Sequence, residues 1–347
     1  MTKPLRVMVV DDSVVNRQTI ADVLREIEGV EVIARAVDGQ EALRMAALLE
    51  PDFITLDLEM PRMDGFTFLR LLMASRPTPV LVVSSFSNVE NMFKALELGA
   101  VDFVPRVGDG ALLRKTLIEK LDALRHTNKT PVVSPSFLTR KTSSPVLAVR
   151  APTTAPTRSE GLPKRLILVG CSTGGPQAIV DLIQRLPATF APAILIAQHM
   201  PERFTTSFAD RLSRRCALPV TEAFDAALVA PGTVWVCPGN RQSTIEVVGE
   251  KLRFRVGPLD PADRHAPPID RLFLSAVALA TRTTAVIMTG MGEDGALGAK
   301  ELLKAGGELW VESAETAIVD GMPAAARKLG PSVVLPLSSL LARIASL

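Results

Sequence analysis

Residues 166–176 read LILVGCSTGGP, and this stretch predicts a buried strand that turns sharply into a helix. Four apolar residues in a row are typical of a buried strand, and glycine permits the tight turn before a helix expected at 176–186. A serine at such a turn, with glycine two positions to either side, has the geometry of an activated nucleophile. The backbone N–H groups that begin the helix can stabilise a developing oxyanion. We therefore expect an α/β fold with a hydrolytic site at Ser172.

The bulk composition predicts a globular chain with two domains and limits the classes of partner. The chain has 347 residues, of which 47% are hydrophobic and 22% charged, so each half can form its own core. The formal net charge of +2 gives no reason to expect nucleic acid or a membrane surface as a partner. The three cysteines form no C-x-x-C pair, which argues against a disulfide framework or a zinc site. We find neither a signal peptide nor an apolar run near the ~20 residues of a membrane span, and expect a cytoplasmic protein without membrane insertion.

Residues 1–124 predict the first domain, because short apolar runs alternate there with amphipathic stretches. Such alternation is typical of a doubly wound parallel sheet with right-handed crossovers, in which ligand chemistry gathers at the carboxyl ends of the strands. The expected strands are 5–10, 30–34, 53–56, 80–83 and 101–104, and the expected helices are 14–27, 40–49, 65–74, 89–98 and 111–124.

A change of composition separates this domain from a second one. Residues 125–163 are rich in proline, serine and threonine, carry several Lys and Arg, and contain Glu160 as their only acid. They predict a flexible basic linker. From residue 164 to 347 the α/β alternation returns, and the segment 220–256 predicts a small antiparallel addition. The buried strands expected here are 166–170, 193–198, 285–289 and 309–312, and the runs within the added segment are 233–237, 244–248 and 252–256.

Three carboxylates are expected to meet at one edge of the first sheet. Asp11 and Asp12 end the first predicted strand, and Asp57 ends the third. Close carboxylates repel one another unless a cation lies among them, and Mg²⁺ is the hard divalent ion that best meets that need. An ionised carboxylate beside Mg²⁺ can accept a phosphoryl group. In the alternative interpretation Asp11 and Asp12 form a solvated loop and Asp57 caps a helix, but DD followed by DLEMPRMDG favours the acidic pocket.

A serine nucleophile needs a base, and the chain has only three histidines. His126 falls at the start of the expected linker, and His265 lies in a proline-rich loop. His199 directly follows the strand expected at 193–198, so it lies at the same sheet edge as Ser172. This position favours His199 over His265 as the base, while a structural histidine at a strand end is the ordinary alternative.

The histidine in turn needs an orienting carboxylate. The strand expected at 285–289 runs into a glycine-rich loop that contains Glu293 and Asp294. We favour Asp294, whose short side chain follows tight glycine turns, although a helix N-cap is its ordinary role. The order Ser, His, Asp argues against an α/β-hydrolase despite the G-x-S-x-G match, and a phosphate-binding loop is disfavoured because the Walker lysine is missing. Cys171 is a weaker nucleophile candidate, because it lies one residue off the turn and is expected to point toward the core.

The N-terminal half resembles the receiver domain of bacterial response regulators. The motifs that carry the resemblance are VVDDS at 9–13, DLEMPRMDG at 57–65, VVSS at 82–85 and GAVDFV at 99–104. The resemblance implies a (βα)5 flavodoxin-like sheet in which Asp57 is the phosphoacceptor. It implies Mg²⁺ bound by Asp12 and Asp57, with help from Asp11 through water. It also implies that Ser84 senses the phosphoryl group and that Phe103 is the aromatic switch.

One departure from the receiver pattern concerns the switch. Receivers usually carry Lys-Pro three residues after the switch aromatic, whereas this chain has Arg106-Val107. Arginine keeps the positive charge, but its reach and its fork geometry differ from those of lysine. We therefore expect phosphorylation at Asp57 to survive and the strength of the switch at Arg106 to differ.

The C-terminal half resembles the catalytic domain of chemotaxis protein-glutamate methylesterases of the CheB type. The motifs are GCSTGGP at 170–176, QHMP at 198–201, PPIDRLF at 267–273, TGMGEDG at 289–295 and GMP at 321–323. The resemblance implies Ser172 as nucleophile, His199 as base and Asp294 as its partner. It also implies an oxyanion site near Thr173 and Met291, and an esterase reaction that needs no cofactor.

Together the two resemblances imply a phosphorylation-regulated hydrolase of chemotactic adaptation. The implied reaction removes methyl esters from glutamates of chemoreceptors, with deamidation of glutamines as related chemistry. A chemotaxis histidine kinase is the implied phosphodonor, and the receiver is expected to cover the catalytic cleft until Asp57 is phosphorylated. Two alternatives remain: a phospho-regulated hydrolase of another ester, and a non-catalytic scaffold that binds receptors and uses its receiver as a phosphate sink.

Overall fold

The computed structural model describes residues 3–85, 89–106, 110–125 and 161–347. These residues form two compact units, one in each half of the chain. Most of the expected linker at 125–163 lies outside the described residues. Leu162 packs against the core of the C-terminal unit and Pro163 is buried. We therefore propose that the C-terminal domain begins by Gly161. None of the described helices is long and apolar enough to cross a membrane.

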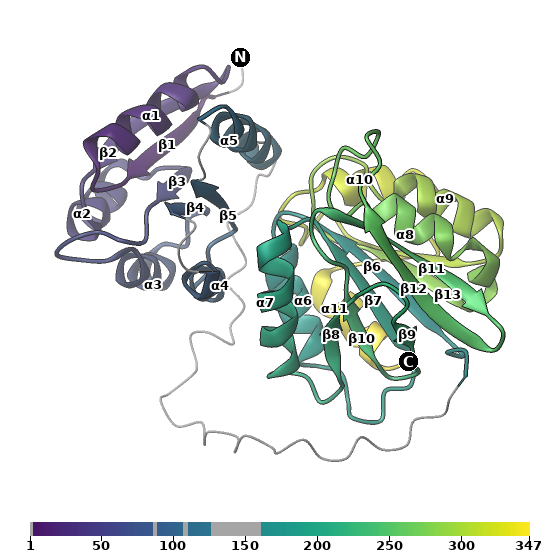
Figure 1. Cartoon of the computed structure of the whole chain (residues 1–347). Coiled ribbons are helices and arrows are strands. Elements are labelled where there is room, and N and C mark those ends of the chain that lie inside the picture. Colours follow the sequence, from purple (N-terminus) through teal and green to yellow (C-terminus); the bar gives the residue numbers. More distant parts are fainter. Residues whose placement is uncertain (1–2, 86–88, 107–109, 126–160) are drawn as a thin grey trace. The chain divides into compact units, whose positions relative to one another are not determined.

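The N-terminal unit is the predicted doubly wound parallel sheet. Its strand order, β2-β1-β3-β4-β5, is that of flavodoxin-like folds. Helices α1 and α5 lie together on one face of the sheet, and α2, α3 and α4 cover the other (Figure 1). The strands are β1 (Leu5–Val10), β2 (Val30–Ala36), β3 (Phe53–Leu56), β4 (Val80–Ser85) and β5 (Asp102–Arg106), and the helices are α1 (Val14–Arg25), α2 (Gly39–Leu49), α3 (Gly65–Ser75), α4 (Val89–Glu97) and α5 (Gly110–Arg125).

Short polar residues fix where the first three helices of this unit begin. The side chains of Ser13, Asp38 and Asp64 accept hydrogen bonds from backbone N–H groups in the first turns of α1, α2 and α3. Such caps satisfy donors that have no partner inside the helix. The caps place each helix directly after a strand–helix turn, which explains why the predicted helix starts agree with the structure to within one residue.

The C-terminal unit is built on a seven-stranded sheet in which every neighbouring pair of strands is parallel. Its order is β15-β14-β13-β6-β7-β10-β8, with the strand that leads to Ser172 near the middle. The strands are β6 (Leu166–Cys171), β7 (Ala193–Gln198), β8 (Val220–Glu222), β10 (Val234–Val236), β13 (Thr283–Ile287), β14 (Glu308–Glu312) and β15 (Val333–Leu335).

The antiparallel addition is real but smaller than predicted. Strands β11 (Arg241–Val248) and β12 (Lys251–Pro258) form a hairpin that pairs with β9 (Leu228–Val229). The run at 233–237, which we expected in this addition, instead forms β10 inside the parallel sheet. Val234 and Val236 are buried there between β7 and β8. The burial that β10 gains between β7 and β8 decides its pairing, although the run is close to the hairpin in sequence.

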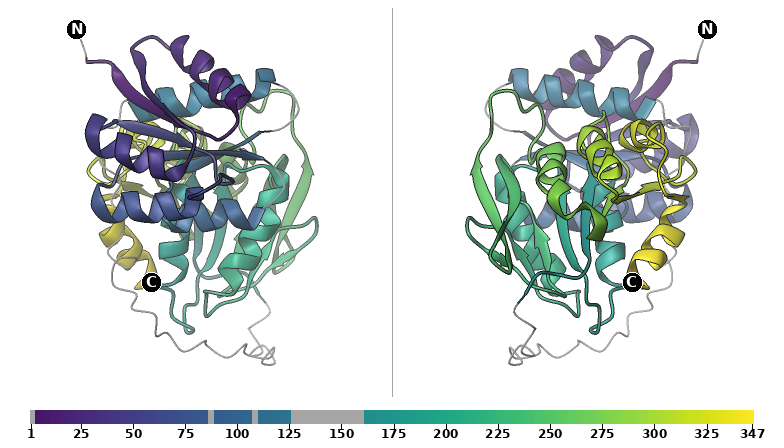
Figure 2. Two further views of the ribbon diagram at one scale, coloured as in Figure 1. Left: turned by 90° about the vertical axis from the view of Figure 1, so that its left-hand side faces the viewer. Right: turned by 90° about the vertical axis from the view of Figure 1, so that its right-hand side faces the viewer.

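Helices cover both faces of the seven-stranded sheet (Figure 2). On one face α8, α9 and α10 share a core with the hairpin, where Phe273 packs among Leu168, Leu195 and Ile287. Trp310 belongs to the opposite face, on which the Arg343 guanidinium of α11 lies 4.8 Å from the ring centroid. The helices are α6 (Gly175–Ile183), α7 (Glu202–Ser213), α8 (Ile269–Ser275), α9 (Ala296–Lys304), α10 (Gly321–Arg327) and α11 (Leu337–Ala345), with a 3₁₀ helix, η2 (Val277–Arg282), before β13.

Candidate active site

Ser172 lies where the strand order of the C-terminal sheet reverses. From β6 the chain continues outward to β7, and it later returns to β13 on the other side of β6. Open α/β sheets bind their ligands beyond the carboxyl ends of the strands at such a reversal. The Ser172 N–H donates to the Thr289 carbonyl, which follows β13, at 3.0 Å. The backbone of the nucleophile is thus tied to the neighbouring strand end.

The glycines around Ser172 are required by close approach of the backbone. Gly174 has φ +81° and is the N-cap of α6, a conformation that favours glycine. A Cβ on Gly175 would lie 2.1 Å from the Gln198 Oε1 atom. Cys171 is fully buried, and burial raises the pKa of its thiol well above the usual range. Cys171 therefore points into the core as expected, and its burial argues against a role as nucleophile.

His199 directly follows β7 and faces a carboxylate. Its Nε2 atom lies 2.8 Å from Oδ2 of Asp294. If Nε2–H donates to that carboxylate, Nδ1 is left as the acceptor that a general base needs. The hydrogen bonds of the described residues do not include one between the Ser172 hydroxyl and the His199 ring. Hydrogen bonds of catalytic groups often close only when substrate binds.

The rival histidine, His265, lies beside His199 rather than apart from it. The two rings stack with their centroids 4.9 Å apart and their planes 13° apart. His265 is exposed and comes from the loop before α8, and the carboxylate pairs with His199. The third histidine, His126, lies outside the described residues. The structure therefore favours His199 as the base and places His265 against its ring.

Asp294 is held by more than the histidine. It is not the N-cap of α9, which is Gly295. Its Oδ2 accepts a hydrogen bond from the Ile269 N–H and its Oδ1 accepts one from the Asp270 N–H, both at 2.9 Å. Burial raises the pKa of Asp294, but the hydrogen bond and charge of His199 and the two backbone donors outweigh it, so the pKa lies below its usual value. Glu293, the alternative, is exposed.

Several buried polar residues behind the site were not predicted from the sequence. The Gln198 Nε2 atom donates to the carbonyl oxygens of both Ser172 and His199, each at 3.0 Å. The Thr289 hydroxyl donates to the Thr173 carbonyl at 2.9 Å, and the Thr289 N–H donates to the buried Glu312 carboxylate at 2.8 Å. These contacts join distant segments, so only the presence of Gln198 and Thr289 in the quoted motifs could have suggested them.

The two residues expected at the oxyanion site both adjoin the nucleophile. Thr173 follows Ser172 in the chain and is buried. Met291 follows Gly290, whose added Cβ would lie 2.9 Å from the Ser172 Cβ. That close approach brings the loop after β13 directly beside the serine. Thr173 and Met291 therefore lie on the two loops that border Ser172.

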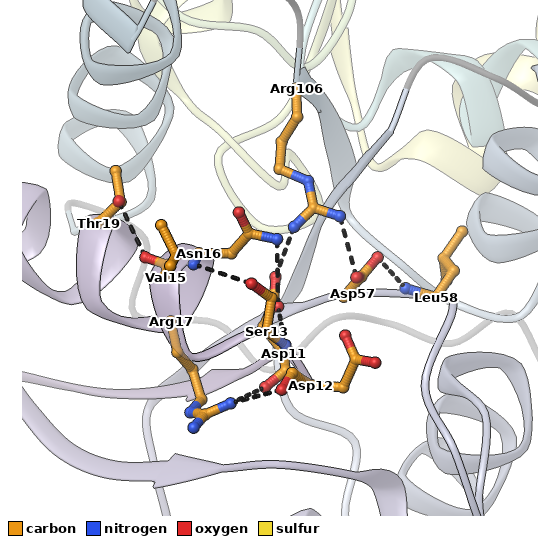
Figure 3. A network of polar contacts seen from close by, with 10 residues as sticks. All are labelled: Asp11, Asp12, Ser13, Val15, Asn16, Arg17, Thr19, Asp57, Leu58 and Arg106. Carbon is orange, nitrogen blue, oxygen red and sulfur yellow. Dashed lines mark hydrogen bonds and ion pairs between the residues drawn. The ribbon is translucent and has the colours of Figure 1, made fainter.

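The N-terminal unit gathers the three predicted carboxylates. Ligand oxygens of Asp11, Asp12 and Asp57 lie within 4.8 Å of one another. Asp11 and Asp57 are buried, whereas Asp12 is exposed. Figure 3 shows the group between the ends of β1 and β3. An all-oxygen donor set of this size fits a hard divalent cation such as Mg²⁺.

Arg106 joins two of these carboxylates. Its Nη1 atom lies 2.6 Å from Oδ2 of Asp11, and its Nη2 atom lies 3.0 Å from Oδ2 of Asp57 (Figure 3). A lysine ammonium is a single point charge and does not offer this fork. Burial raises the pKa of Asp11 to about 6; the Arg106 charge lowers it in part, and the Asp57 charge adds to the increase.

The remaining switch residues lie on adjacent strands. Ser84 belongs to β4, next to β3 in the sheet, and its side chain is buried. Phe103 of β5 is also buried and pairs in register with Val82. The sheet thus brings Ser84 and Arg106 to the edge that carries Asp57. Val107 lies outside the described residues.

Comparisons with known proteins agree over both halves. A family model described as CheB methylesterase matches residues 167–344, and one described as response regulator receiver domain matches residues 7–118. Protein-glutamate methylesterase/protein-glutamine glutaminase 1 of Myxococcus xanthus is 42% identical over 99% of this chain and 97% of its own length. The corresponding protein 6 of Anaeromyxobacter dehalogenans is 44% identical over 99% of this chain and 95% of its own. The crystal structure of the Thermotoga maritima CheB methylesterase catalytic domain has a TM-score of 0.51 and 34% identity, covering 52% of this chain and 97% of that domain.

Proposed function

This chain belongs to the CheB methylesterase family and carries a receiver domain, and we propose that Ser172, His199 and Asp294 form its catalytic triad. The chain is a protein-glutamate methylesterase/protein-glutamine glutaminase, and its receiver domain indicates regulation by phosphorylation. The observation that carries the triad is the 2.8 Å contact between His199 and Asp294, beside the loop that holds Ser172.

The proposed mechanism is acyl transfer through Ser172. The Nδ1 atom of His199 removes the hydroxyl proton while the serine oxygen attacks the glutamyl carbonyl carbon. His199 then gives that proton to the departing methanol, or to ammonia when the substrate is glutamine. Water attacks the resulting acyl-serine ester by the same route, which restores the Ser172 hydroxyl and leaves a glutamate side chain in the receptor.

Two loops provide the rest of this chemistry. Asp294 keeps Nε2 of His199 protonated and stabilises the imidazolium that forms after proton transfer. The oxyanion of the tetrahedral intermediate would accept hydrogen bonds from the backbone N–H groups of Thr173 and Met291. Their support is positional: Thr173 begins the turn before α6, and Met291 follows Gly290, whose added Cβ would lie 2.9 Å from the Ser172 Cβ.

We propose that the substrates are methyl-accepting chemoreceptors, acted on in their cytoplasmic helices. A chemotaxis histidine kinase would supply the phosphoryl group to Asp57. Asp11, Asp12 and Asp57 would hold Mg²⁺, which when bound offsets the charge of the incoming phosphoryl group. Arg106 and Ser84 lie at the same sheet edge and would contact the phosphoryl oxygens, and Phe103 would respond to that contact.

We further propose that the receiver restrains the esterase until Asp57 is phosphorylated. A fragment that begins at Gly161 keeps Leu162 in its core and every residue of the proposed triad. If the receiver covers the site, this fragment should be faster than the unphosphorylated full-length chain and should not respond to acetyl phosphate. A well-folded fragment no faster than the resting chain would instead favour direct activation by the receiver.

The decisive experiment measures methanol released from methylated chemoreceptor, with and without acetyl phosphate. The wild-type chain should release methanol, and the rate should rise with acetyl phosphate. Ser172→Ala should release none above background. A hydrolase of another ester would leave the receptor methylated while cleaving small esters. A non-catalytic scaffold would bind receptor and take up phosphate without hydrolysing the receptor or the small esters.

A further inference from the structure

Asp294 has a structural partner that the proposed mechanism does not use. Helix α8 begins after Pro268, whose side chain cannot cap it. The first N–H groups of a helix lack partners within that helix. Here Asp294 supplies the cap from another segment, because its carboxylate accepts from the first two N–H groups of α8, those of Ile269 and Asp270. The catalytic carboxylate is therefore anchored to α8.

Asp270 returns the same contact to the helix that follows Asp294. Helix α9 begins after Gly295, which also has no capping side chain. The Gly298 N–H, in the first turn of α9, donates to Oδ1 of Asp270 at 2.8 Å. Asp294 thus caps α8, in which Asp270 lies, and Asp270 caps α9, which begins shortly after Asp294.

Close packing fixes the distance between the two helices. A Cβ on Gly298 would lie 2.4 Å from the Phe273 Cβ, and a Cβ on Gly295 would lie 2.8 Å from the Ile269 Cγ2. The same Ile269 methyl group would lie 2.6 Å from a Cβ on Gly170, two residues before the nucleophile. Ile269 therefore packs tightly between β6, which leads to Ser172, and the loop that contains Asp294.

The arrangement holds two carboxylates near each other in a poorly solvated place. Burial, with a smaller contribution from the charge of Asp294, raises the pKa of Asp270 to about 6. Asp270 accepts its hydrogen bond from the backbone N–H of Gly298, just as Asp294 accepts from backbone N–H groups of α8. Because such backbone donors have fixed positions, the pair of caps defines where both carboxylates lie.

We propose that Asp270 is a positioning residue for the esterase reaction. It holds the first turn of α9, which fixes the loop that carries Asp294, and Asp294 in turn fixes the tautomer and orientation of the His199 ring. This inference rests on the proposed triad and adds a residue that contacts neither the substrate nor the reacting atoms. A small displacement of Asp294 should therefore slow the chemical step and leave substrate binding nearly unchanged.

The first test compares Asp270→Ala with Asp270→Asn in the full-length chain treated with acetyl phosphate, using methylated receptor. Asp270→Ala should lower kcat by about 10- to 100-fold, with KM within about twofold of wild type. Asp270→Asn should recover most of that loss, because its amide oxygen can still accept from the Gly298 N–H. Glu301→Gln is the matched control on α9, since Glu301 pairs only with Lys304 near the surface, and it should stay within about twofold.

Three outcomes would overturn the proposal. These are an Asp270→Ala variant with wild-type kcat, a loss confined to KM, and an Asn variant as slow as the Ala variant. Circular dichroism and thermal unfolding check that each variant is folded. If Asp270→Ala does not fold, Asp270→Ser replaces it in the kinetic and spectroscopic tests, because its shorter hydroxyl cannot reach the Gly298 N–H; the same loss of kcat is expected, and a wild-type kcat would overturn the proposal.

The second test separates this proposal from the triad itself. If Asp294→Ala stays active, the triad is wrong; if it is inactive while Asp270→Ala is normal, only the positioning role fails. Asp270→Ala should cost less than about twofold when added to Asp294→Ala, because the two act through one contact. The proton on Nε2 of His199, identified by its loss in His199→Gln, should give a far-downfield NMR resonance that persists in Asp270→Asn and broadens or moves in Asp270→Ala. An unchanged resonance in Asp270→Ala would overturn the proposal.

Discussion

The two sites of this chain occupy the same place in their sheets but are held by different groups. In the N-terminal unit, Asp11 and Asp57 directly end β1 and β3, and one side-chain cation, Arg106, joins them. In the C-terminal unit, Asp294 lies in a loop well beyond the end of β13. Its partners are the ring of His199 and the backbone N–H groups that begin α8.

This difference suits the two kinds of chemistry. A guanidinium on a long side chain can leave a carboxylate when a metal ion or a phosphoryl group arrives, so the acidic pocket can change its contacts. Backbone donors at a helix start cannot move without moving the helix, so the Asp294 carboxylate is held in one orientation. We call the group of Asp11, Asp57 and Arg106 the exchangeable site, and the group of Ser172, His199 and Asp294 the fixed site. The predictions below test each of them.

The largest loss of methanol release should come from removing the hydroxyl of Ser172, the proposed nucleophile of the fixed site. Ser172→Ala should lower methanol release by about 10⁴-fold or more, as loss of a triad member does. His199→Ala should be comparably slow, and the double variant should be no slower. Phosphorylation of Asp57 by acetyl phosphate should continue in all three, measured by incorporated label. If His265→Ala were the inactive variant instead, the base would be wrongly assigned.

Removal of the proposed phosphoacceptor Asp57 should abolish phosphorylation of the exchangeable site and leave the resting esterase activity of the fixed site unchanged. Asp57→Asn should take up no label from acetyl phosphate or from phosphorylated kinase, because the amide cannot accept the phosphoryl group. Its methanol release should stay at the resting level of the wild-type chain. Label that persists in Asp57→Asn would place the acceptor elsewhere, and Glu59→Gln, an exposed neighbour, serves as the control.

A residue behind the fixed site should have an intermediate effect. Gln198→Leu removes the donor shared by the carbonyl oxygens of Ser172 and His199, which directly follow two different strands, β6 and β7. We expect kcat to fall about tenfold and the free energy of unfolding to fall by about 1–3 kcal/mol, since two partly buried carbonyl oxygens each lose a hydrogen-bond donor. Gln177→Leu, which affects only a contact with Asp181 on α6, is the control. A normal kcat in Gln198→Leu would show that the nucleophile and base are held independently.

A smaller effect should follow from changing the cation of the exchangeable site. Arg106→Lys keeps the charge but cannot contact Asp11 and Asp57 together through a fork. Mg²⁺ should then bind a few-fold more tightly, measured by titration calorimetry, because it displaces one contact rather than two. Acetyl phosphate should also stimulate methanol release more than in the wild-type chain. Unchanged Mg²⁺ affinity would mean that Arg106 does not compete with the metal.

The two sites should also differ in their response to pH. Burial raises the pKa of Asp11 to about 6, so a proton competes with Mg²⁺ there as the pH falls below that value. Mg²⁺ affinity should be steady above pH 7 and fall by about tenfold per unit well below pH 6. Asp11→Asn should bind Mg²⁺ weakly and without this dependence. Asp294, whose pKa lies below its usual value, should stay ionised over the same range, so the His199 proton resonance should persist.

Prediction from the sequence was most accurate for features that depend on residues close together in the chain. The caps of Ser13, Asp38 and Asp64 lie within three residues of the N–H groups that they accept from. Asp11, Asp57, Ser172 and His199 each lie within one residue of a strand end, so hydrophobic patterning placed them at a sheet edge. The run at 233–237 was placed wrongly, because its pairing with β7 and β8 depends on partners far away in the sequence.

The sequence by itself therefore determined two parallel sheets, the strand ends that carry the acidic pocket, and the turn that carries Ser172. Periodicity and turn chemistry act over a few residues, and these features need nothing more. Only the tertiary structure decided that Arg106 joins two carboxylates, that Gln198 ties Ser172 to His199, and that Asp270 and Asp294 cap each other's helices. These contacts depend on crossings between elements that lie far apart in the chain, and no local pattern encodes the distance or direction of such a crossing.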